Sequence, residues 1–178
     1  MEVLFLRVGE AVYVAPLASL AEVLMPAALR AVPTAPPFLR GLLNLRGHIV
    51  PVIDLRERLH LPERGRLGRA NRVLRIQTGH HDLGVIVDEV LHIGVLNPEQ
   101  RRRSALSHAG TDRLLGDLWE VGGTLVQQLN LGRLLSDAEL EAMGDKVALE
   151  HQADGGARES NSHQASTGRL AADARSQS

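Results

Sequence analysis

The first candidates for chemistry in this chain are carboxylates at the ends of apolar runs. Asp54 ends one run, and Asp88 and Glu89 end another. Two carboxylates that converge in one pocket can serve as general acid and general base. An aspartate at a strand end also accepts backbone hydrogen bonds, which favours a structural role. A hydrolase using Asp54 and Asp88 stays an alternative hypothesis, which requires their side chains to converge.

The other chemical motifs are weak. His80-His81-Asp82 lies at an expected hairpin tip, where adjacent histidines point apart and further metal ligands are not spaced nearby. The sequence contains no Gly-x-Ser-x-Gly elbow, no Gly-x-Gly-x-x-Gly motif and no Walker loop. We therefore predict a protein that is not an enzyme and that uses no cofactor and no metal.

The most informative segment is 41–59, which reads GLLNLRGHIVPVIDLRERL. Two β-rich runs meet at Arg46-Gly47, which predicts a hairpin. A permanently charged guanidinium at the tip of an apolar hairpin is a candidate contact for another protein, because Arg pairs with carboxylates in a planar, bidentate way. Alternatively, Arg46 braces its own turn by pairing with Glu22. From the residues alone the two interpretations stand equal.

Composition limits the possible functions. The chain has 178 residues, a net charge of −1, no cysteine and only four aromatic residues. Near-neutral charge and scarce aromatics disfavour nucleic-acid binding, although a small β-barrel nucleic-acid binder stays the alternative function. No apolar run approaches the length of a membrane span, and the N-terminus lacks the pattern of a signal peptide. We predict a cytoplasmic protein that does not insert directly into a membrane.

A repeated pattern indicates a duplicated β unit. Leu4-x-Leu6-x-Val8-Gly9 leads to Val12-x-Val14, and Leu74-x-Ile76-x-Thr78-Gly79 leads to Leu83-x-Val85-x-Val87. Both alternate with period two, as half-buried hairpin strands do. The run around Gly47–Leu59 has a fainter counterpart around Gly123–Leu135. We expect two mostly antiparallel β lobes, one from each half of the chain, packed over a shared apolar seam.

Polar segments suggest the boundaries. The stretch 62–71 is predicted to link the lobes within a domain over 1–149, and 150–178 is predicted to be a disordered polar tail. Arg101–Arg103 is expected in a solvated loop.

Local signals add three details. Helical spacing predicts short helices over Leu17–Leu24 and Leu131–Met143, the latter capped near Ser136-Asp137. Pro51 is expected at an edge or a bulge, because proline cannot donate to a ladder.

The run FLRGLLNLRGHIVPVIDLRERL, from Phe38 to Leu59, closely resembles the signature of the bacterial chemotaxis coupling protein CheW family. That signature is a Gly-x-x-Asn-Leu-Arg-Gly turn followed by an Ile-Val-Pro-Val-Ile-Asp-Leu strand. The run LGVIVDEVLHI resembles the family's second-half strand, and the resemblance covers about residues 1–142. The basic Arg101–Arg103 region and the tail depart from the family pattern.

The resemblance implies a mostly β fold of two SH3-like, five-stranded β-barrel subdomains around a common apolar core, with short helices. It also implies a non-catalytic adaptor that couples helical chemoreceptor tips, lying in a groove between the subdomains, to the regulatory domain of a CheA-type histidine kinase. The signalling output stays open. The residues carried over as receptor- or kinase-binding are Arg46, Glu22, Asn44, Gly47, Val23 and Val87.

Overall fold

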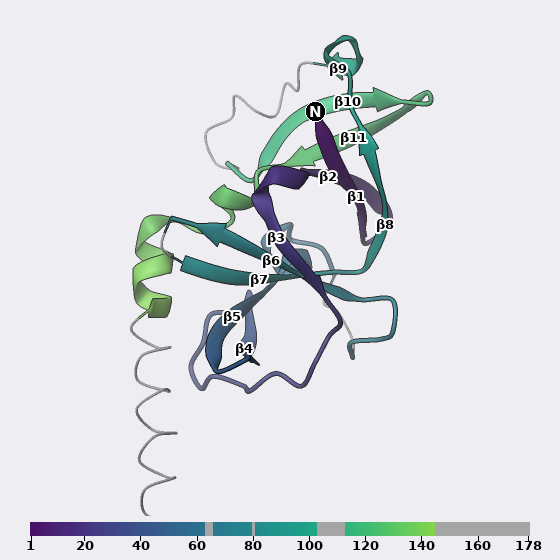
Figure 1. Cartoon of the computed structure of the whole chain (residues 1–178). Coiled ribbons are helices and arrows are strands. Elements are labelled where there is room, and N and C mark those ends of the chain that lie inside the picture. Colours follow the sequence, from purple (N-terminus) through teal and green to yellow (C-terminus); the bar gives the residue numbers. More distant parts are fainter. Residues whose placement is uncertain (63–65, 80, 103–112, 145–178) are drawn as a thin grey trace, which may run out of the picture. The chain divides into compact units, whose positions relative to one another are not determined.

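The computed structural model describes residues 1–62, 66–79, 81–102 and 113–144. The chain divides into two compact units, Met1–Leu140 and Glu141–Ser178. Every described strand belongs to the first unit, which is therefore the frame of any site built on the sheets (Figure 1). The predicted tail over 150–178 lies outside the described residues, so its disorder and the boundary near 149 stay predictions.

Two sheets make up the first unit, and we call them sheet A and sheet B. Sheet A has six strands in the order β8 (Glu89–Val95), β1 (Glu2–Val8), β2 (Ala11–Pro16), β11 (Thr124–Leu129), β10 (Leu115–Val121) and β9 (Arg101–Arg102). Sheet B has five strands in the order β3 (Leu20–Leu24), β6 (Arg72–Thr78), β7 (His81–Val87), β5 (His48–Asp54) and β4 (Leu39–Leu45). The predicted mostly β fold is confirmed.

The predicted repeat is present in the backbone. Hairpins β1–β2 and β6–β7 turn at Gly9 and Gly79, whose φ angles are 62° and 60°. Hairpins β4–β5 and β10–β11 follow later in each repeat. Each sheet also contains one parallel pair at the same place, β2 with β11 and β7 with β5. The strands β1–β5 therefore correspond to β6, β7, β8, β10 and β11.

The two repeats exchange their first hairpins. Sheet A joins β1 and β2 of the first repeat to β8, β10 and β11 of the second, and sheet B does the reverse. The prediction that each half of the chain forms its own lobe is therefore wrong. Periodicity identifies a hairpin because a hairpin is local, whereas the sheet that it joins depends on long-range pairing.

The polar stretch 62–71 does not separate the lobes. It follows β5 and α1 (Leu55–Arg58) and leads to β6, and both strands belong to sheet B. Among the described strands, the chain crosses between sheets at β2–β3, through the 3-10 turn η1 (Leu17–Ser19), and at β7–β8. Sheet B is thus one continuous segment inserted into sheet A.

The core is mostly aliphatic, because the chain has only four aromatic residues. On sheet A, buried side chains gather around Phe5 and Trp119, with Val3, Val14, Leu96 and Val126. On sheet B, Leu43, Val52, Val73 and Ile86 form a second cluster. Burial of such apolar surface is the dominant favourable term in folding.

Neither sheet closes into a barrel among the described strands, which differs from the predicted five-stranded barrels. The end strands are β8 and β9 in sheet A and β3 and β4 in sheet B. The sixth strand of sheet A comes from two of the arginines expected in a loop. Arg101 and Arg102 pair with β10, and their guanidiniums lie 2.6 Å from Asp117 and 2.9 Å from Glu120.

Of the two predicted helices, the one over Leu131–Met143 is found in part and the one over Leu17–Leu24 is wrong. Leu17–Leu24 forms η1 and then β3, because pairing of Leu20–Leu24 with β6 overrides the helical spacing. The segment from Leu131 contains the 3-10 turn η4 (Leu131–Arg133) and then a helix over 137–144. Ser136 caps that helix through a reciprocal pair of hydrogen bonds with Glu139.

Pro51 lies in a central strand rather than at an edge. It stands opposite Leu42, whose N–H and C=O both bond to Arg30 and so point away from β5. The missing N–H of Pro51 is therefore not required by β4, and pairing with β7 begins one residue later at Val52. The ladder tolerates the proline without a bulge at this position.

Candidate protein-docking site

The turn between β4 and β5 has a backbone that suits glycine better than arginine. Arg46 and Gly47 form a two-residue connection between Leu45 and His48, with φ angles of 54° and 91°. Positive φ at both central residues is the geometry of a type I′ hairpin turn. The Asn44 side-chain oxygen accepts a hydrogen bond of 2.8 Å from the Gly47 N–H, which fixes the turn. Asn44 and Gly47 thus hold the shape that presents Arg46.

The corresponding turn in the second repeat carries no side chain. It connects Val121 to Thr124 through Gly122 and Gly123, whose φ angles are 56° and 79°. A non-glycine residue in the left-handed region pays about 1–2 kcal/mol for the close approach of its Cβ to the following carbonyl oxygen. The chain accepts this cost at Arg46 and avoids it at the equivalent position.

Arg46 stands at the exposed end of a chain of charges. Its side chain is 83% exposed, and its guanidinium lies 3.8 Å from Glu22. Glu22 also lies 3.8 Å from Arg75, and Arg75 pairs with Asp82 at 2.6 Å. The hydrogen bond that the Arg75 guanidinium donates to Asp82 is the main cause that raises the pKa of Arg75. The predicted Arg46–Glu22 pair exists, but at 3.8 Å in solvent it stabilises the fold only weakly.

Strand β3 presents two different surfaces. Glu22 stands opposite Arg75 in β6, and Val23 stands opposite the buried Leu74. Because successive side chains of a strand point to opposite faces, Glu22 and Val23 serve different surfaces. Val23 is 44% exposed, whereas Val87 is fully buried in β7. Val87 is therefore a core residue and cannot contact a partner in this conformation.

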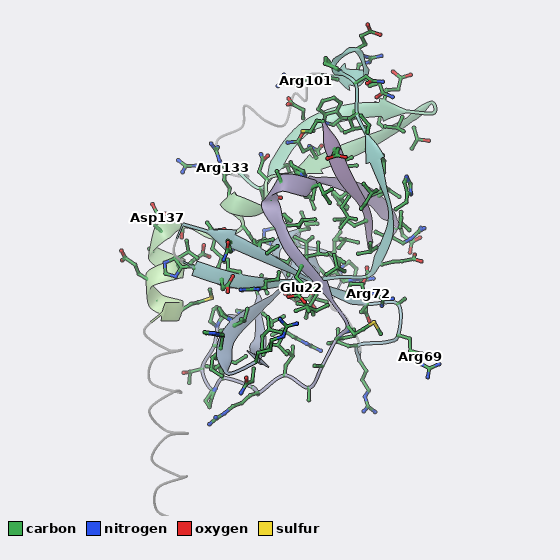
Figure 2. All side chains as sticks on the ribbon, in the orientation of Figure 1. Glu22, Arg69, Arg72, Arg101, Arg133 and Asp137 are labelled. Atoms are coloured by element: carbon green, nitrogen blue, oxygen red, sulfur yellow. The ribbon has the colours of Figure 1, made fainter. Side chains whose placement is uncertain are left out.

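Sequence reasoning missed Arg75 and Asp82. A possible signal was Arg75 in the otherwise apolar run Val73–Ile76, facing Asp82 across a hairpin turned at Gly79. The register of this hairpin pairs Arg75 with Gly84 and places Asp82 opposite Gln77, so the ion pair is diagonal. Figure 2 labels Glu22 on β3, the end strand of sheet B that pairs with β6.

The carboxylates considered for catalysis have structural partners. Asp54 is buried and accepts a hydrogen bond from the N–H of Arg56, which caps α1. Asp88 lies 2.9 Å from the Arg56 guanidinium and accepts a 2.6 Å hydrogen bond from the Gly9 N–H. The bond to Asp88 is the main cause that raises the pKa of Arg56. These contacts support the structural role expected for strand-end aspartates.

The part of the chain that the structure describes holds no group of three or more His, Cys, Asp or Glu side chains suited to a metal ion. His80 lies outside the described residues. Among the described helices, none has the length and apolar character needed to cross a bilayer.

The two repeats expose apolar side chains at equivalent edge positions. Val23 stands opposite Leu74, and Ile93 stands opposite Leu4. Leu74 and Leu4 are equivalent, because each precedes the glycine of its hairpin turn by the same number of residues. Val95, two residues after Ile93, is 63% exposed, and Met25, two residues after Val23, is 60% exposed. Both β3 and β8 end their sheets, so each edge offers a similar apolar strip.

A groove of about 510 Å³ lies on sheet A. Tyr13, Leu115, Leu118 and Leu125 line it together with Leu59, which follows α1. Burial raises the pKa of the Tyr13 phenol. Arg46 and Glu22 are not among its lining residues. This groove is therefore not the expected receptor groove with Arg46 and Glu22 at its edge.

Comparisons with known proteins agree on one family. The family model described as "CheW-like domain" matches residues 2–139. A chemotaxis protein CheW from Klebsiella aerogenes is 35% identical over 120 residues, covering 65% of this chain and 69% of that protein. Protein FrzA from Myxococcus xanthus is 31% identical over 144 residues, covering 77% of this chain and 86% of that protein.

A solved structure supports the fold. The scaffolding protein TtCheW from Thermoanaerobacter tengcongensis matches with a TM-score of 0.68 at 22% identity, covering 75% of this chain and 90% of that chain. At this identity the match supports the fold alone, including its two sheets.

Proposed function

The chain belongs to the CheW-like family of chemotaxis scaffold proteins, and we propose that it is a non-catalytic, cytoplasmic adaptor in a chemosensory array. In this proposal it couples the helical cytoplasmic tip of a methyl-accepting chemoreceptor to the regulatory domain of a CheA-type histidine kinase. The family match supports the scaffold role, and the finer assignment rests on the residues below.

The strained turn at Arg46 carries the proposal. Arg46 is 83% exposed and adopts a φ of 54°, whereas the second repeat places Gly122 at a φ of 56°. A conformational cost retained at an exposed side chain, with little return from its 3.8 Å ion pair, is typical of a functional position. A role in recognition accounts for the side chain better than a role as a brace.

The charges around Arg46 suit a helical partner. Glu22 lies between two guanidiniums, those of Arg46 and Arg75, which leaves Arg46 free to turn toward an incoming carboxylate. Arg75 is held by Asp82, so it keeps Glu22 in place while Arg46 moves. A receptor helix with an acidic side chain and a basic one, a turn apart, would pair with Arg46 and Glu22.

A second contact is needed for coupling. Val23 faces the surface opposite to that of Glu22, so a partner at the β3 edge and a partner at Arg46 can bind together. Arrays repeat such contacts many times, so that modest affinities suffice through effective concentration. Val23 is therefore assigned to the partner other than the receptor tip.

Reversal of the Arg46 charge tests the proposal. Arg46→Glu is expected to keep the circular dichroism spectrum and to lower receptor binding by about tenfold or more, because it replaces an attraction to a partner carboxylate by repulsion. Gly122→Glu places the same charge on the equivalent turn and is the matched control. Measurement uses pull-down on receptor fragments and kinase activation in a reconstituted array. Unchanged coupling by a folded Arg46→Glu variant would sink the proposal.

A further inference from the structure

The outer edge of sheet B has no strand beside it among the described residues. β3 ends that sheet, and exposed apolar side chains lie at Val23 on the strand and at Met25 just after it. An end strand presents unpaired N–H and C=O groups, and an extended segment can add to them as a further strand. Side chains at alternate positions of the edge then select the segment that adds.

A group of arginines flanks this edge. Leu24 pairs with Val73, so the end of β3 lies beside the start of β6 and the loop before it. In that loop Arg66 and Arg69 are exposed, and within the described part of the chain neither has an acidic partner. Figure 2 shows Arg69 and Arg72 at the same end of the sheet.

Arg72 holds the loop in place. Its guanidinium donates hydrogen bonds of 2.6, 3.2 and 2.7 Å to the backbone oxygens of Arg69, Ala70 and Asn71. These bonds fix the backbone of the arginine-bearing loop against β6. The backbone that bears Arg69 is therefore held beside the start of β6.

The equivalent edge in the other sheet has the same apolar strip and a different charge. Val95 on β8 stands opposite Glu2, which occupies in β1 the place that Arg72 occupies in β6. Ile93 and Val95 thus repeat the exposed pair Val23 and Met25 beside an acid instead of arginines. The β8 edge is therefore an internal control for the β3 edge, because the two share exposed apolar side chains and differ in the charge beside them.

We propose that the β3 edge docks an extended protein segment that alternates apolar and acidic residues. Its backbone would extend sheet B, its apolar side chains would cover Val23 and Met25, and its carboxylates would pair with Arg66 and Arg69. The carboxylates of this segment would project to the surface of Glu22, because successive side chains of a strand point to opposite faces. Glu22 is already paired there with Arg46 and Arg75, which limits its repulsion of the incoming carboxylates. The inference rests on the proposed adaptor function, since it names the chemistry of the second partner.

Two labelled decapeptides test the inference on the full chain. One alternates valine with glutamate, and the other alternates valine with lysine. By fluorescence anisotropy at low salt, we expect the glutamate peptide to bind about tenfold more tightly or better, with a preference that shrinks as salt screens the charges. Val23→Asp is expected to abolish its binding and Arg69→Glu to weaken it about tenfold. Ile93→Asp and Arg133→Glu are the matched controls and should leave it unchanged.

The outcomes separate this inference from the proposed function. Failure of the glutamate peptide to bind, equal binding of both peptides, or an equal loss in Ile93→Asp would each overturn the inference. If Val23→Asp does not fold, Val23→Ser replaces it. Receptor coupling that still depends on Arg46 would then leave the adaptor function standing. Loss of that dependence, with selective peptide binding retained, would instead refute the adaptor function alone.

Discussion

The turn of hairpin β4–β5 and the turn of hairpin β10–β11 have the same backbone and different side chains. Both have two central residues with positive φ. The second turn uses Gly122 and Gly123, which is the choice that the backbone favours. The first turn places Arg46 there instead. The difference shows that both repeats need the same turn backbone for folding. A side chain that is kept in this turn at a cost in stability therefore indicates a role other than folding.

The same contrast extends along the neighbouring strand pairs. In sheet B, Glu22 stands opposite Arg75 and forms an ion pair with it. At the equivalent place in sheet A, His92 stands opposite Phe5, and their rings stack with centroids 4.5 Å apart. Sheet B thus places an ion pair at the position where sheet A places two stacked rings.

The two crossovers between the sheets should differ most in stability. At the β7–β8 crossover, Asp88 bonds both the Arg56 guanidinium and the Gly9 N–H. We expect Asp88→Ala to lower the free energy of unfolding by about 2–3 kcal/mol, because it leaves a partly buried guanidinium and an N–H unpaired. Urea denaturation measures this change. Asp88→Asn, which keeps an acceptor for Gly9, should cost less.

The β2–β3 crossover supplies the control for Asp88. There the Ser19 hydroxyl donates to the Pro16 oxygen at 2.6 Å within one turn. Ser19→Ala should cost about 1 kcal/mol or less, because this hydrogen bond is local and neutral. If Asp88→Ala and Ser19→Ala lowered the free energy of unfolding equally, Asp88 would not be a special stabiliser of the β7–β8 crossover.

The end of the second repeat gives a smaller, pH-dependent effect. Burial would raise the pKa of Glu139, but hydrogen bonds from the Ser136 N–H and hydroxyl, together with the Arg58 guanidinium, lower it. A lowered pKa in the folded state means that the ionised carboxylate stabilises the fold above its unfolded pKa of about 4.3. That stability is lost as the pH falls through the folded pKa.

The variant Glu139→Gln tests this effect. At neutral pH we expect it to lower the free energy of unfolding by about 1 kcal/mol, since it weakens the cap of helix 137–144 and the pair with Arg58. The difference from the parent protein should shrink below about pH 4, where the carboxyl group is protonated. A difference that stays constant from pH 7 to pH 3 would contradict the assignment of charge to this contact.

The sequence predicts the local features of this molecule well. Alternation around Leu4–Leu6 and Leu74–Ile76 identifies hairpin strands, and Arg46-Gly47 identifies a turn, because these patterns depend on neighbours in the chain. The partner of Glu22 was also predictable, although its strand was mistaken for a helix. Five residues with apolar spacing satisfy either period, and pairing with β6 decided between them.

The exchange of hairpins and the burial of Val87 could not be read in the same way. Which sheet β1 joins depends on pairing with β8, far along the chain. The family resemblance assigns Val87 to a partner surface, but β7 is buried from Leu83 to Val87 and lies between β5 and β6 in its sheet. A strand in the middle of a sheet is buried more fully than alternation alone indicates. Arg75 escaped notice because its partners come from two other strands.

An exchange of residues between the two turns tests the central claim most directly. Arg46→Gly gives the first turn the residue of the second and should raise the free energy of unfolding by about 0.5–1 kcal/mol, because it relieves the left-handed arginine. The same variant should lose receptor-dependent kinase activation by about tenfold or more, and Gly122→Arg should leave activation unchanged. The decisive measurement is kinase activation by Arg46→Gly in a reconstituted array. A more stable protein with activation lost is the predicted result, and full activation would contradict a recognition role for Arg46.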